Sequence, residues 1–461
     1  MEEFWNQPSS LWANTAVILP DGGKVTYGEL YHRADTFASQ LPERSFLVMK
    51  VDNDLLTICA YLACLRHDHV ALLLSRDLKD NLLDDLIERY KPDYLYSVDE
   101  GGHYSLTPLF AKEHQGRTFH PDLSLLLSTS GSTGSPKLVR LTKKNLLQNA
   151  RSIADYLELT ATERPITNLP FYYSYGLSIL NSHLQVGAAL LLTKDSLVSP
   201  AFWKFYVEGQ ATSLAGVPYT YDMLEAVAFR KRSVSSLRYM TQAGGHMSSD
   251  MVLRYASWAK ERGIRFYVMY GQTEATARMS YLPPHLAEEH PGSIGYAIPG
   301  GEFSLMDDDG NLISDCNEEG ELVYKGANVC MGYASSREDL LSGDVNQGVL
   351  HTGDIAKRDE QGLFYITGRL KRFLKIAGNR FALDELEEQF LRRGIHAVCG
   401  GTDNRLLVAV TEETSKKEAE GFLKSTWHLM KTQYRVFVVE SIPRSETGKV
   451  LYEELFKSPS L

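Results

Sequence analysis

Short apolar runs alternate with helical stretches over residues 45–130, and this alternation constrains the fold more than any other feature of the chain. The apolar runs are typical of buried strands and cover 46–51, 70–74, 94–98 and 123–129. Stretches with helical periodicity separate them and cover 55–66 and 78–90. Because strands and helices alternate, the pattern predicts βαβ units, and hence a parallel sheet with helices on its faces.

The last of these apolar runs ends in a segment rich in hydroxyls and glycines. Residues 129–137 read Thr-Ser-Gly-Ser-Thr-Gly-Ser-Pro-Lys. Glycines let backbone N–H groups approach a ligand closely, and amides, hydroxyls and a lysine together suit phosphate oxygens. The segment is not a Walker loop, because Pro136 precedes Lys137. A flexible linker is the alternative interpretation, but linkers rarely follow a buried strand directly.

Composition narrows the class of protein. The 461 residues are 43% hydrophobic and 23% charged, which suffices for two or three cores. The net charge is −10 and no basic block occurs, so neither nucleic acid nor an anionic membrane surface is expected as a partner. The five cysteines are scattered without a Cys-x-x-Cys pair, so we expect buried thiols in a reducing compartment rather than a zinc site or disulfides.

The N-terminus and the overall hydropathy indicate the cell compartment in which the protein is expected. Met1-Glu2-Glu3-Phe4-Trp5 is acidic and lacks the apolar core of a signal peptide. No apolar run is long enough to cross a bilayer, so no membrane span is expected. We therefore expect a cytoplasmic protein.

Local patterns predict further elements on either side of this region. Thr26 and Glu29 have capping-box spacing and should begin a helix, and Thr142 should cap a helix that runs to about Leu157. Asp309-Gly310 predicts a hairpin within a β-rich segment over 292–333. The residues after 371 predict a compact α/β unit, with helices near 383–393 and 415–431 and strands near 396–400, 405–411 and 434–440.

A second polar turn follows a strand at Tyr270-Gly271-Gln272-Thr273-Glu274. An aromatic ring can stack on a purine, a threonine hydroxyl can bond a phosphate, and a glutamate can hold Mg²⁺. A strand end with a solvated glutamate is the alternative.

Together these two motifs resemble those of the adenylate-forming superfamily, which includes acyl-CoA synthetases, firefly luciferases and the adenylation domains of peptide synthetases. Other signatures of that family occur in the family's order, so the resemblance extends over residues 128–449. They are Leu169–Leu177, Ala243-Gly244-Gly245, Thr352-Gly353-Asp354, Gly368-Arg369-Leu370-Lys371 and Gly448-Lys449.

The resemblance implies an α/β fold in two domains. Residues 1–370 would form a large N-terminal domain of layered α/β sheets with a β-rich subdomain. Residues 371–461 would form a small, mobile C-terminal α+β domain that carries the catalytic lysine, with Lys371 as the hinge.

The resemblance also implies ATP and Mg²⁺ as cofactors, with three residues closest to the chemistry. Lys449 would bridge a carboxylate and the α-phosphate, Thr273 would contact the α-phosphate, and Glu274 would position the metal. The implied ATP-binding residues are Thr129, Ser130, Gly131, Ser132, Thr133, Gly134, Lys137, Gly244, Gly245, Tyr270, Gly271, Gln272, and the ribose-binding Asp354 and Arg369.

An acyl pocket is implied at Tyr172, Tyr173, Ser174, Gly176 and Tyr219. Tyr173 stands where many members carry histidine, so a histidine-dependent role does not transfer. Ser174 stands where amino-acid activators carry aspartate, and the asparagine of aryl-acid activators is also missing. A fatty or simple organic acid is therefore favoured. The alternative is a stand-alone amino-acid or aryl-acid adenylation enzyme that loads a carrier protein.

The family further implies transfer of the acyl group to a thiol after the small domain rotates, with Gly378 in the thiol channel. The acceptor would be coenzyme A or the phosphopantetheine arm of a separate acyl or peptidyl carrier protein. No carrier domain follows Leu461, so loading in cis is not expected. A luciferase-like oxygenase and a non-catalytic nucleotide-binding scaffold are the other functional alternatives. The Lys449 motif also resembles a site of regulatory acetylation.

Overall fold

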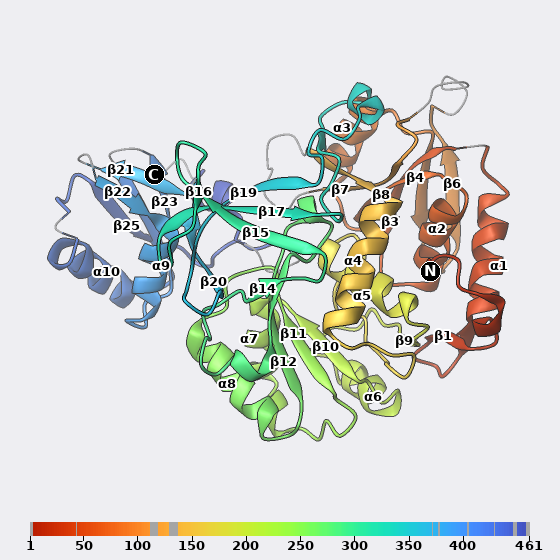
Figure 1. The fold of residues 1–461 in the computed structure, drawn as a ribbon, viewed down its shortest axis with the longest axis horizontal. Helices are drawn as coiled ribbons and strands as arrows, with labels where there is room; N and C mark the ends of the chain where they lie inside the picture. The colour runs from red at the N-terminus through yellow and green to blue at the C-terminus, as the bar shows by residue number, and fades with distance from the viewer. Residues whose placement is uncertain are drawn as a thin grey trace. The chain divides into compact units, whose positions relative to one another are not determined.

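The structure is a computed structural model that describes residues 3–42, 44–110, 119–128, 137–370, 372–376, 379–402, 405–427, 429–445 and 450–457. Figure 1 traces the chain. It divides into two compact units. The first contains Met1–Glu302 and Tyr324–Leu350, and the second contains Phe303–Val323 and His351–Leu461. The predicted boundary at 370/371 stays a prediction.

A seven-stranded sheet forms one half of the first unit. Its order is β18 (Tyr333–Ala334), β8 (Leu138–Thr142), β7 (Leu123–Ser128), β4 (Val70–Ser75), β3 (Phe46–Val51), β5 (Tyr94–Val98) and β6 (Tyr104–Pro108). The central strands β7, β4, β3 and β5 are parallel, as the sequence predicts, whereas β6, β8 and β18 join antiparallel. The antiparallel strands β6 and β8 were not predicted.

Helices cover both faces of this sheet, which is why its strands are continuously apolar. Side chains alternate between the faces along a strand. Met49 of β3 belongs to a core with α1 (Tyr27–Ala38) and α2 (Leu55–Arg66), whereas Val48 belongs to a core with α3 (Asp80–Tyr90). The predicted capping box of Thr26 and Glu29 is present at the start of α1.

A second sheet of five strands lies in the same unit. Its order is β10 (Ser213–Gly216), β11 (Tyr239–Gln242), β12 (Arg265–Tyr270), β13 (Ser280–Leu282) and β14 (Tyr296–Ala297). The first three strands are parallel and the last two are antiparallel. Three helices accompany it, namely α6 (Pro200–Glu208), α7 (Pro218–Ala226) and α8 (Ser249–Lys260).

Helices α4 (Lys143–Tyr156) and α5 (Ser174–Gln185) lie between these two sheets (Figure 1). Leu146 of α4 and Leu177 of α5 share a core with the seven-stranded sheet. Ile153 of α4 and Tyr175 of α5 share another core with β10, β11 and β12. Thr142 caps α4 with a capping box, as predicted. Because α5 is buried on both sides, its first turn is held rigidly at the site described below.

Smaller elements complete the first unit. A three-stranded sheet has the order β2 (Lys24–Thr26), β1 (Thr15–Ile18) and β9 (Leu190–Leu191). Single 3₁₀ turns occur at Ser9–Leu11, Phe229–Lys231, Thr273–Ala275, Pro284–Leu286 and Glu338–Leu341.

The second unit contains most of another five-stranded sheet, ordered β16 (Leu312–Ile313), β15 (Gly301–Met306), β17 (Glu319–Gly326), β19 (Val349–Arg358) and β20 (Phe364–Arg369). The predicted hairpin joins β15 to β16, and Gly310 supplies its positive φ of 82°.

The rest of the second unit is a compact α/β arrangement, as the sequence predicts. Strands β21 (Phe373–Ile376) and β22 (Asn379–Ala382) pair, and β23 (Ala397–Thr402), β24 (Arg405–Val410) and β25 (Tyr434–Val438) form a three-stranded sheet. The helices are α9 (Leu383–Leu391), α10 (Glu413–Ser425) and α11 (Tyr452–Phe456).

Two expectations from composition can be compared with the structure. All five cysteines are free thiols, and every one except Cys316 is buried. In the part of the chain that the structure describes, no helix has both the length and the apolar character needed to cross a membrane.

Candidate functional site

Two predicted site segments and the Val217-Pro218 turn follow the carboxyl ends of neighbouring parallel strands. Gly216, Gln242 and Val268 lie in register on β10, β11 and β12. The chain leaves these strands into Val217-Pro218, Ala243–Gly245 and Tyr270–Glu274. Ligands of open parallel sheets bind at the carboxyl ends of the strands. The fold thus brings three segments that are distant in sequence to one edge of the sheet.

The turn after Tyr270 requires glycine. A Cβ on Gly271 would lie 1.8 Å from the carbonyl oxygen of Ala277, because the returning chain passes directly against this residue. The Met279 N–H donates to the Tyr270 carbonyl oxygen at 2.9 Å and closes the turn. This close approach of two backbone segments fixes Gln272, Thr273 and Glu274 at the strand end.

Glu274 is held in one orientation by Tyr333. The Tyr333 hydroxyl donates to Glu274 Oε1 at 2.6 Å. Burial raises the pKa of Tyr333, and the neighbouring carboxylate raises it further, so the phenol remains a hydrogen-bond donor. Tyr333 was absent from the predicted site. The sequence feature that could have pointed to Tyr333 is the glycine before it. Gly332 has a φ of 108°, which only glycine adopts readily.

Lys137 also approaches Tyr333, through the aromatic ring. Its ammonium nitrogen is 5.9 Å from the ring centroid, within the range of a cation–π contact. Strand β8 begins at the next residue, Leu138, which pairs with Ser128 of β7 and with Ala334 of β18. The described ends of the Ser/Gly-rich loop therefore meet beside Tyr333, and a lysine and a glutamate flank one phenol.

Arg140 holds the segment that carries Tyr333. It is 1% exposed, and its guanidinium donates to the carbonyl oxygens of Met331 at 2.8 Å and Gly343 at 3.2 Å. Its backbone N–H donates to the Gly332 carbonyl oxygen at 3.0 Å. Sequence reasoning missed this residue as well. A single charged residue inside the apolar strand 138–142 was the signal that could have identified it.

The start of α5 reaches the same strand end. Ser174 Oγ and Thr273 Oγ1 are 3.3 Å apart, so a predicted acyl-pocket residue contacts a predicted phosphate-binding residue. Gly176 permits this arrangement, because a Cβ there would lie 2.1 Å from the Pro170 carbonyl oxygen. The helix can therefore begin directly against the Leu169-Pro170 segment.

Tyr173 approaches the second glycine turn. A Cβ on Gly244 would lie 2.2 Å from the Tyr173 hydroxyl oxygen, and Gly244 has a φ of 81°. Burial raises the pKa of Tyr173 to about 12, so the phenol is neutral. The Gly245 carbonyl oxygen accepts from Gln242 Nε2 at 2.9 Å. Gly244 and Gly245 thus line the same strand edge as Thr273.

Four further predicted site residues of the first unit lie in different surroundings. Gln272 Nε2 donates to the Tyr270 hydroxyl oxygen at 3.2 Å, so these two residues lie together at the strand end. Tyr172 packs against the core beneath the seven-stranded sheet. Tyr219 is 47% exposed on the first turn of α7. The acyl-pocket assignment of these two tyrosines stays a prediction.

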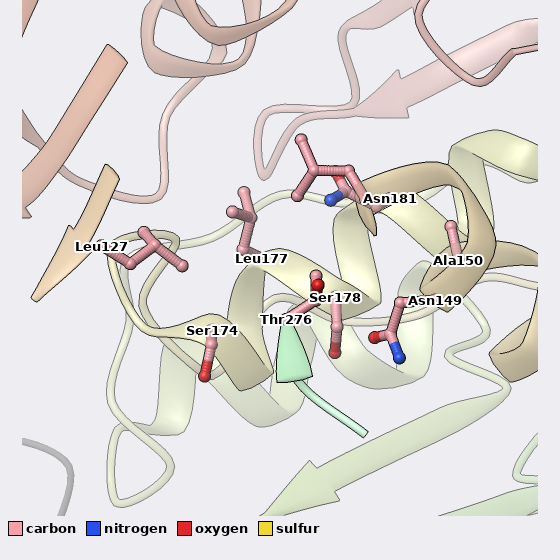
Figure 2. Close-up of a pocket in the computed structure, with 9 residues that line it drawn as sticks. Leu127, Asn149, Ala150, Ser174, Leu177, Ser178, Asn181 and Thr276 are labelled. Atoms are coloured by element: carbon pink, nitrogen blue, oxygen red, sulfur yellow. The ribbon is translucent and has the colours of Figure 1, made fainter. Parts of the chain in front are cut away.

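A small cavity of about 10 Å³ lies behind Ser174. Figure 2 shows residues of β7, α4 and α5 around it, with the Ser174, Ser178 and Asn149 side chains directed to the same side. Thr276 of the turn after Glu274 also lines it. The cavity offers hydroxyl and amide groups between apolar walls, and one water molecule needs about this volume.

The predicted ribose-binding pair lies in the second unit. Asp354 of β19 and Arg369 of β20 are register partners, and Arg369 Nε lies 2.8 Å from Asp354 Oδ1. Asp354 is 2% exposed, whereas the Arg369 side chain is 59% exposed. Their assignment to the ribose stays a prediction.

Several predicted residues lie outside the described part of the chain. These are the loop residues Thr129, Ser130, Gly131, Ser132, Thr133 and Gly134, the hinge Lys371, the thiol-channel Gly378 and the catalytic Lys449. Their assigned roles stay predictions.

The donor set at the strand end fits Mg²⁺. Among the residues that the structure describes, no group of three or more His, Cys, Asp or Glu side chains could hold a metal ion. Mg²⁺ usually binds to one or two carboxylates and takes its other ligands from substrate phosphates and water. A single oriented carboxylate at Glu274, with the Thr273 hydroxyl beside it, is consistent with this mode of coordination.

This fold, with glycine turns, a lysine and an oriented glutamate at one strand edge, defines a protein of the adenylate-forming class. The chain belongs to the AMP-binding enzyme family, whose model matches residues 4–334. It is 30% identical over 349 residues to the long-chain-fatty-acid–CoA ligase of Salmonella typhimurium, covering 72% of this chain and 61% of the ligase. The chain therefore spans less than two thirds of that relative.

Other comparisons agree with this family. The oxalate–CoA ligase of Arabidopsis thaliana is 28% identical over 348 residues, covering 72% of this chain and 66% of the ligase. The O-succinylbenzoate coenzyme A synthetase of Bacillus subtilis, solved with AMP, matches the fold with a TM-score of 0.82 and 22% identity over 99% of this chain and 98% of that one. The same enzyme has also been solved with ATP and a magnesium ion, and that structure gives a TM-score of 0.77 with 22% identity over 96% of each chain.

Proposed function

We propose that the chain is an ATP-dependent acid–thiol ligase. It activates a carboxylic acid as an acyl-adenylate with release of pyrophosphate. It then transfers the acyl group to a thiol of coenzyme A or of phosphopantetheine on a separate carrier protein.

One observation carries the proposal. Ser174 of the predicted acyl pocket contacts Thr273 of the predicted phosphate site, at the strand end where Tyr333 orients Glu274. An enzyme that joins an acid to the α-phosphate must hold the two anions side by side. Ser174 is assigned to the acid and Thr273 to ATP, so their contact supports a site in which the two substrates bind next to each other.

In the first step, a carboxylate oxygen attacks the α-phosphorus. The new O–P bond forms as the bond to the bridging oxygen breaks, and pyrophosphate leaves with both electrons of that bond. Thr273 would donate to an α-phosphate oxygen, and Lys137 would neutralise charge on the leaving phosphates. Glu274 would hold Mg²⁺, which supplies charge neutralisation on the phosphates when it is bound.

In the second step, a thiol attacks the acyl carbonyl carbon. The C–S bond forms, the C–O bond to AMP breaks, and the thiol proton passes to solvent. Lys449 would act in the first step and withdraw before the second, when the small domain rotates about Lys371 and presents Gly378 to the thiol.

The acid is proposed as a fatty or simple organic acid. The relatives' names include a long-chain-fatty-acid ligase and an oxalate ligase, so the family accepts acids of very different size. Ser174 carries no charge that could hold an α-ammonium group. This absence favours a non-amino acid.

The test is ATP–pyrophosphate exchange by purified protein across fatty acids of several lengths, aryl acids, hydroxy acids and amino acids. Exchange that depends on a fatty or simple organic acid is the expected result. Exchange with amino acids alone contradicts the substrate class. No exchange with any acid, although ATP binds, contradicts the proposed activity and favours a scaffold.

A further inference from the structure

Arg278 is a buried cation in the first unit. It is 3% exposed and lies between the Thr273–Ala275 turn and strand β13. A guanidinium stays charged in proteins, and burying a charge is costly unless an anion and hydrogen bonds compensate for it. Buried arginines are accordingly found with carboxylates or with a full set of hydrogen-bond acceptors.

In the part of the chain that the structure describes, Arg278 has neither a carboxylate partner nor a full set of hydrogen-bond acceptors. It takes part in no ion pair there, and its buried Nε has no hydrogen-bond partner. Its side chain contacts aromatic residues: its Cζ lies 3.7 Å from the ring centroid of Tyr175, and the guanidinium interacts with the Tyr156 hydroxyl.

The contrast with Arg140 is informative. Both arginines are almost completely buried, but the Arg140 guanidinium donates to several backbone carbonyl oxygens. Arg140 thus has the compensation expected of a structural residue. Arg278 lacks that compensation, and a cation–π contact replaces only part of it.

The backbone of Arg278 is fixed between the nucleotide motif and the cavity. Its Cα would lie 2.9 Å from a Cβ on Gly271, so it passes directly against the turn that positions Thr273. Its carbonyl oxygen accepts from Asn149 Nδ2 at 2.9 Å, and Asn149 lines the cavity behind Ser174.

Its side chain extends over the first turn of α5. Tyr175, on which it stacks, follows Ser174 directly in the helix. Burial raises the pKa of the predicted acyl-pocket residue Tyr173, and the charge of Arg278 acts in the opposite direction, in agreement with the position of the guanidinium on the adjacent Tyr175 ring. Arg278 therefore faces the region in which the acyl chain of a substrate is proposed to bind.

We propose that Arg278 is a specificity-determining residue that binds a second carboxylate of the acid substrate, so that the preferred substrate is a dicarboxylic acid. This inference rests on the proposed function. One carboxylate would react beside Thr273, and the other would pair with the guanidinium. A planar guanidinium binds a carboxylate through two parallel hydrogen bonds, and one of these would satisfy the Nε that the protein leaves unpaired.

The test is ATP–pyrophosphate exchange with monocarboxylic and α,ω-dicarboxylic acids matched in carbon number. We expect the wild-type protein to favour a dicarboxylic acid over its matched monocarboxylic acid. Arg278→Gln should lower kcat/KM for that dicarboxylic acid by about 30-fold or more, because one partner of a buried charge pair is lost. Its kcat/KM for monocarboxylic acids should change little. Arg278→Lys, which keeps the charge, should retain part of the preference.

The matched control is Arg262→Gln, which removes an arginine that stacks on Trp258 near the end of α8. It should leave the preference unchanged. If wild type favours the monocarboxylic acid at every length, the inference is wrong and the proposed function still stands. An equal loss for both acid classes in Arg278→Gln would assign Arg278 to structure or to the reacting carboxylate, and also overturns it. Absence of exchange with any acid overturns the proposed function and this inference together. If Arg278→Gln does not fold, the wild-type preference together with Arg278→Lys tests the inference, and Arg278→Lys with the full wild-type preference or with equal losses for both acid classes overturns it.

Discussion

At the scale of single residues, the site depends on groups that orient one another before any substrate binds. Glu274 cannot hold a metal in a fixed place by itself, because its side chain would rotate freely at a strand end. The Tyr333 hydroxyl removes that freedom through a 2.6 Å hydrogen bond, and Arg140 in turn holds the segment that carries Tyr333. The proposed metal site is therefore preorganised by residues that never touch the metal.

Tyr333→Phe tests whether the Tyr333 hydroxyl is needed to orient Glu274. The loss of a hydrogen bond to a charged group costs about 1.5–3 kcal/mol, which corresponds to about a 10- to 100-fold loss in kcat/KM for MgATP. The measurement is ATP–pyrophosphate exchange as a function of MgATP concentration. Tyr94→Phe, in a strand of the seven-stranded sheet, is the control. An unchanged KM and kcat in Tyr333→Phe would contradict the role of the phenol.

Gly244→Ala tests the packing between the second glycine turn and Tyr173. The added Cβ would lie 2.2 Å from the Tyr173 hydroxyl oxygen, so one of the two segments must move. We expect exchange activity to fall at least about tenfold, because this strand edge is where the nucleotide is proposed to bind. Adding Tyr173→Phe removes the clashing oxygen and should restore part of the activity.

Gly300→Ala separates this clash from backbone strain. Gly300 has a φ of 83°, nearly that of Gly244, but nothing lies within 4 Å of its added Cβ. It should therefore show only the strain of a positive φ, about 1–2 kcal/mol in the free energy of unfolding, with exchange activity intact. Equal activity losses in the two alanine variants would show that strain alone explains the effect at Gly244.

At the scale of elements, α5 joins the site to the core. Ser174 and Tyr175 stand at its start, and His183 stands near its end. His183 is buried between the Ile179 carbonyl oxygen at 2.8 Å and the Tyr239 hydroxyl at 2.7 Å. Burial lowers the pKa of His183 to about 4. The helix that presents the site is therefore anchored by a neutral histidine.

This anchor predicts a loss of stability in acid. Between the ordinary pKa of histidine, about 6.5, and the folded value of about 4, the unfolded chain binds a proton that the folded chain does not. Folding stability is thus complete above that window and falls as the pH decreases through it. From pH 7 to pH 5 the contribution of His183 amounts to about 2 kcal/mol.

Urea unfolding at several pH values measures this effect. His183→Gln cannot titrate, so its free energy of unfolding should depend less on pH than that of wild type. His103→Gln is the control, because the His103 side chain is 83% exposed. A His183→Gln variant with the wild-type pH dependence would contradict the prediction. His69 has a pKa lowered to about 4 by burial and should account for part of the remaining dependence.

At the scale of the whole molecule, the two proposed half-reactions should be separable. Lys449→Ala should nearly abolish formation of the acyl-adenylate, because it removes the cation proposed to bridge the two anions. It should spare transfer to thiol from a supplied acyl-adenylate. Lys371→Pro should do the reverse, because proline restricts rotation at the proposed hinge. Rapid-quench assays of each half-reaction make the comparison, and equal losses in both steps for either variant contradict its assigned role.

Much of the fold was predictable because local patterns and tertiary structure agree in it. The apolar runs at 46–51 and 94–98 became strands with those bounds, and Thr142 capped its helix. Strand β8 was missed because its residues follow the Ser/Gly loop directly and its pairing with β7 is antiparallel. Such pairing depends on partners distant in sequence, which no local pattern encodes.

The site was predictable only in part, for a related reason. Residues in contiguous motifs, such as Thr273 and Glu274, could be recognised by spacing. Tyr333, Arg140 and Arg278 act through contacts across 59 or more positions in sequence or through the lack of a partner. Only the folded chain reveals that a tyrosine meets a glutamate, or that an arginine is buried without an anion.

The most direct test of the proposed function follows a labelled oxygen. An accepted acid, labelled with ¹⁸O in its carboxylate, is turned over with ATP and a thiol, and the AMP, pyrophosphate and phosphate are analysed by mass spectrometry. Attack of the carboxylate on the α-phosphorus, followed by thiol attack at the acyl carbon, places one labelled oxygen in each AMP. Label in pyrophosphate or phosphate, or AMP without label, would contradict adenylate formation.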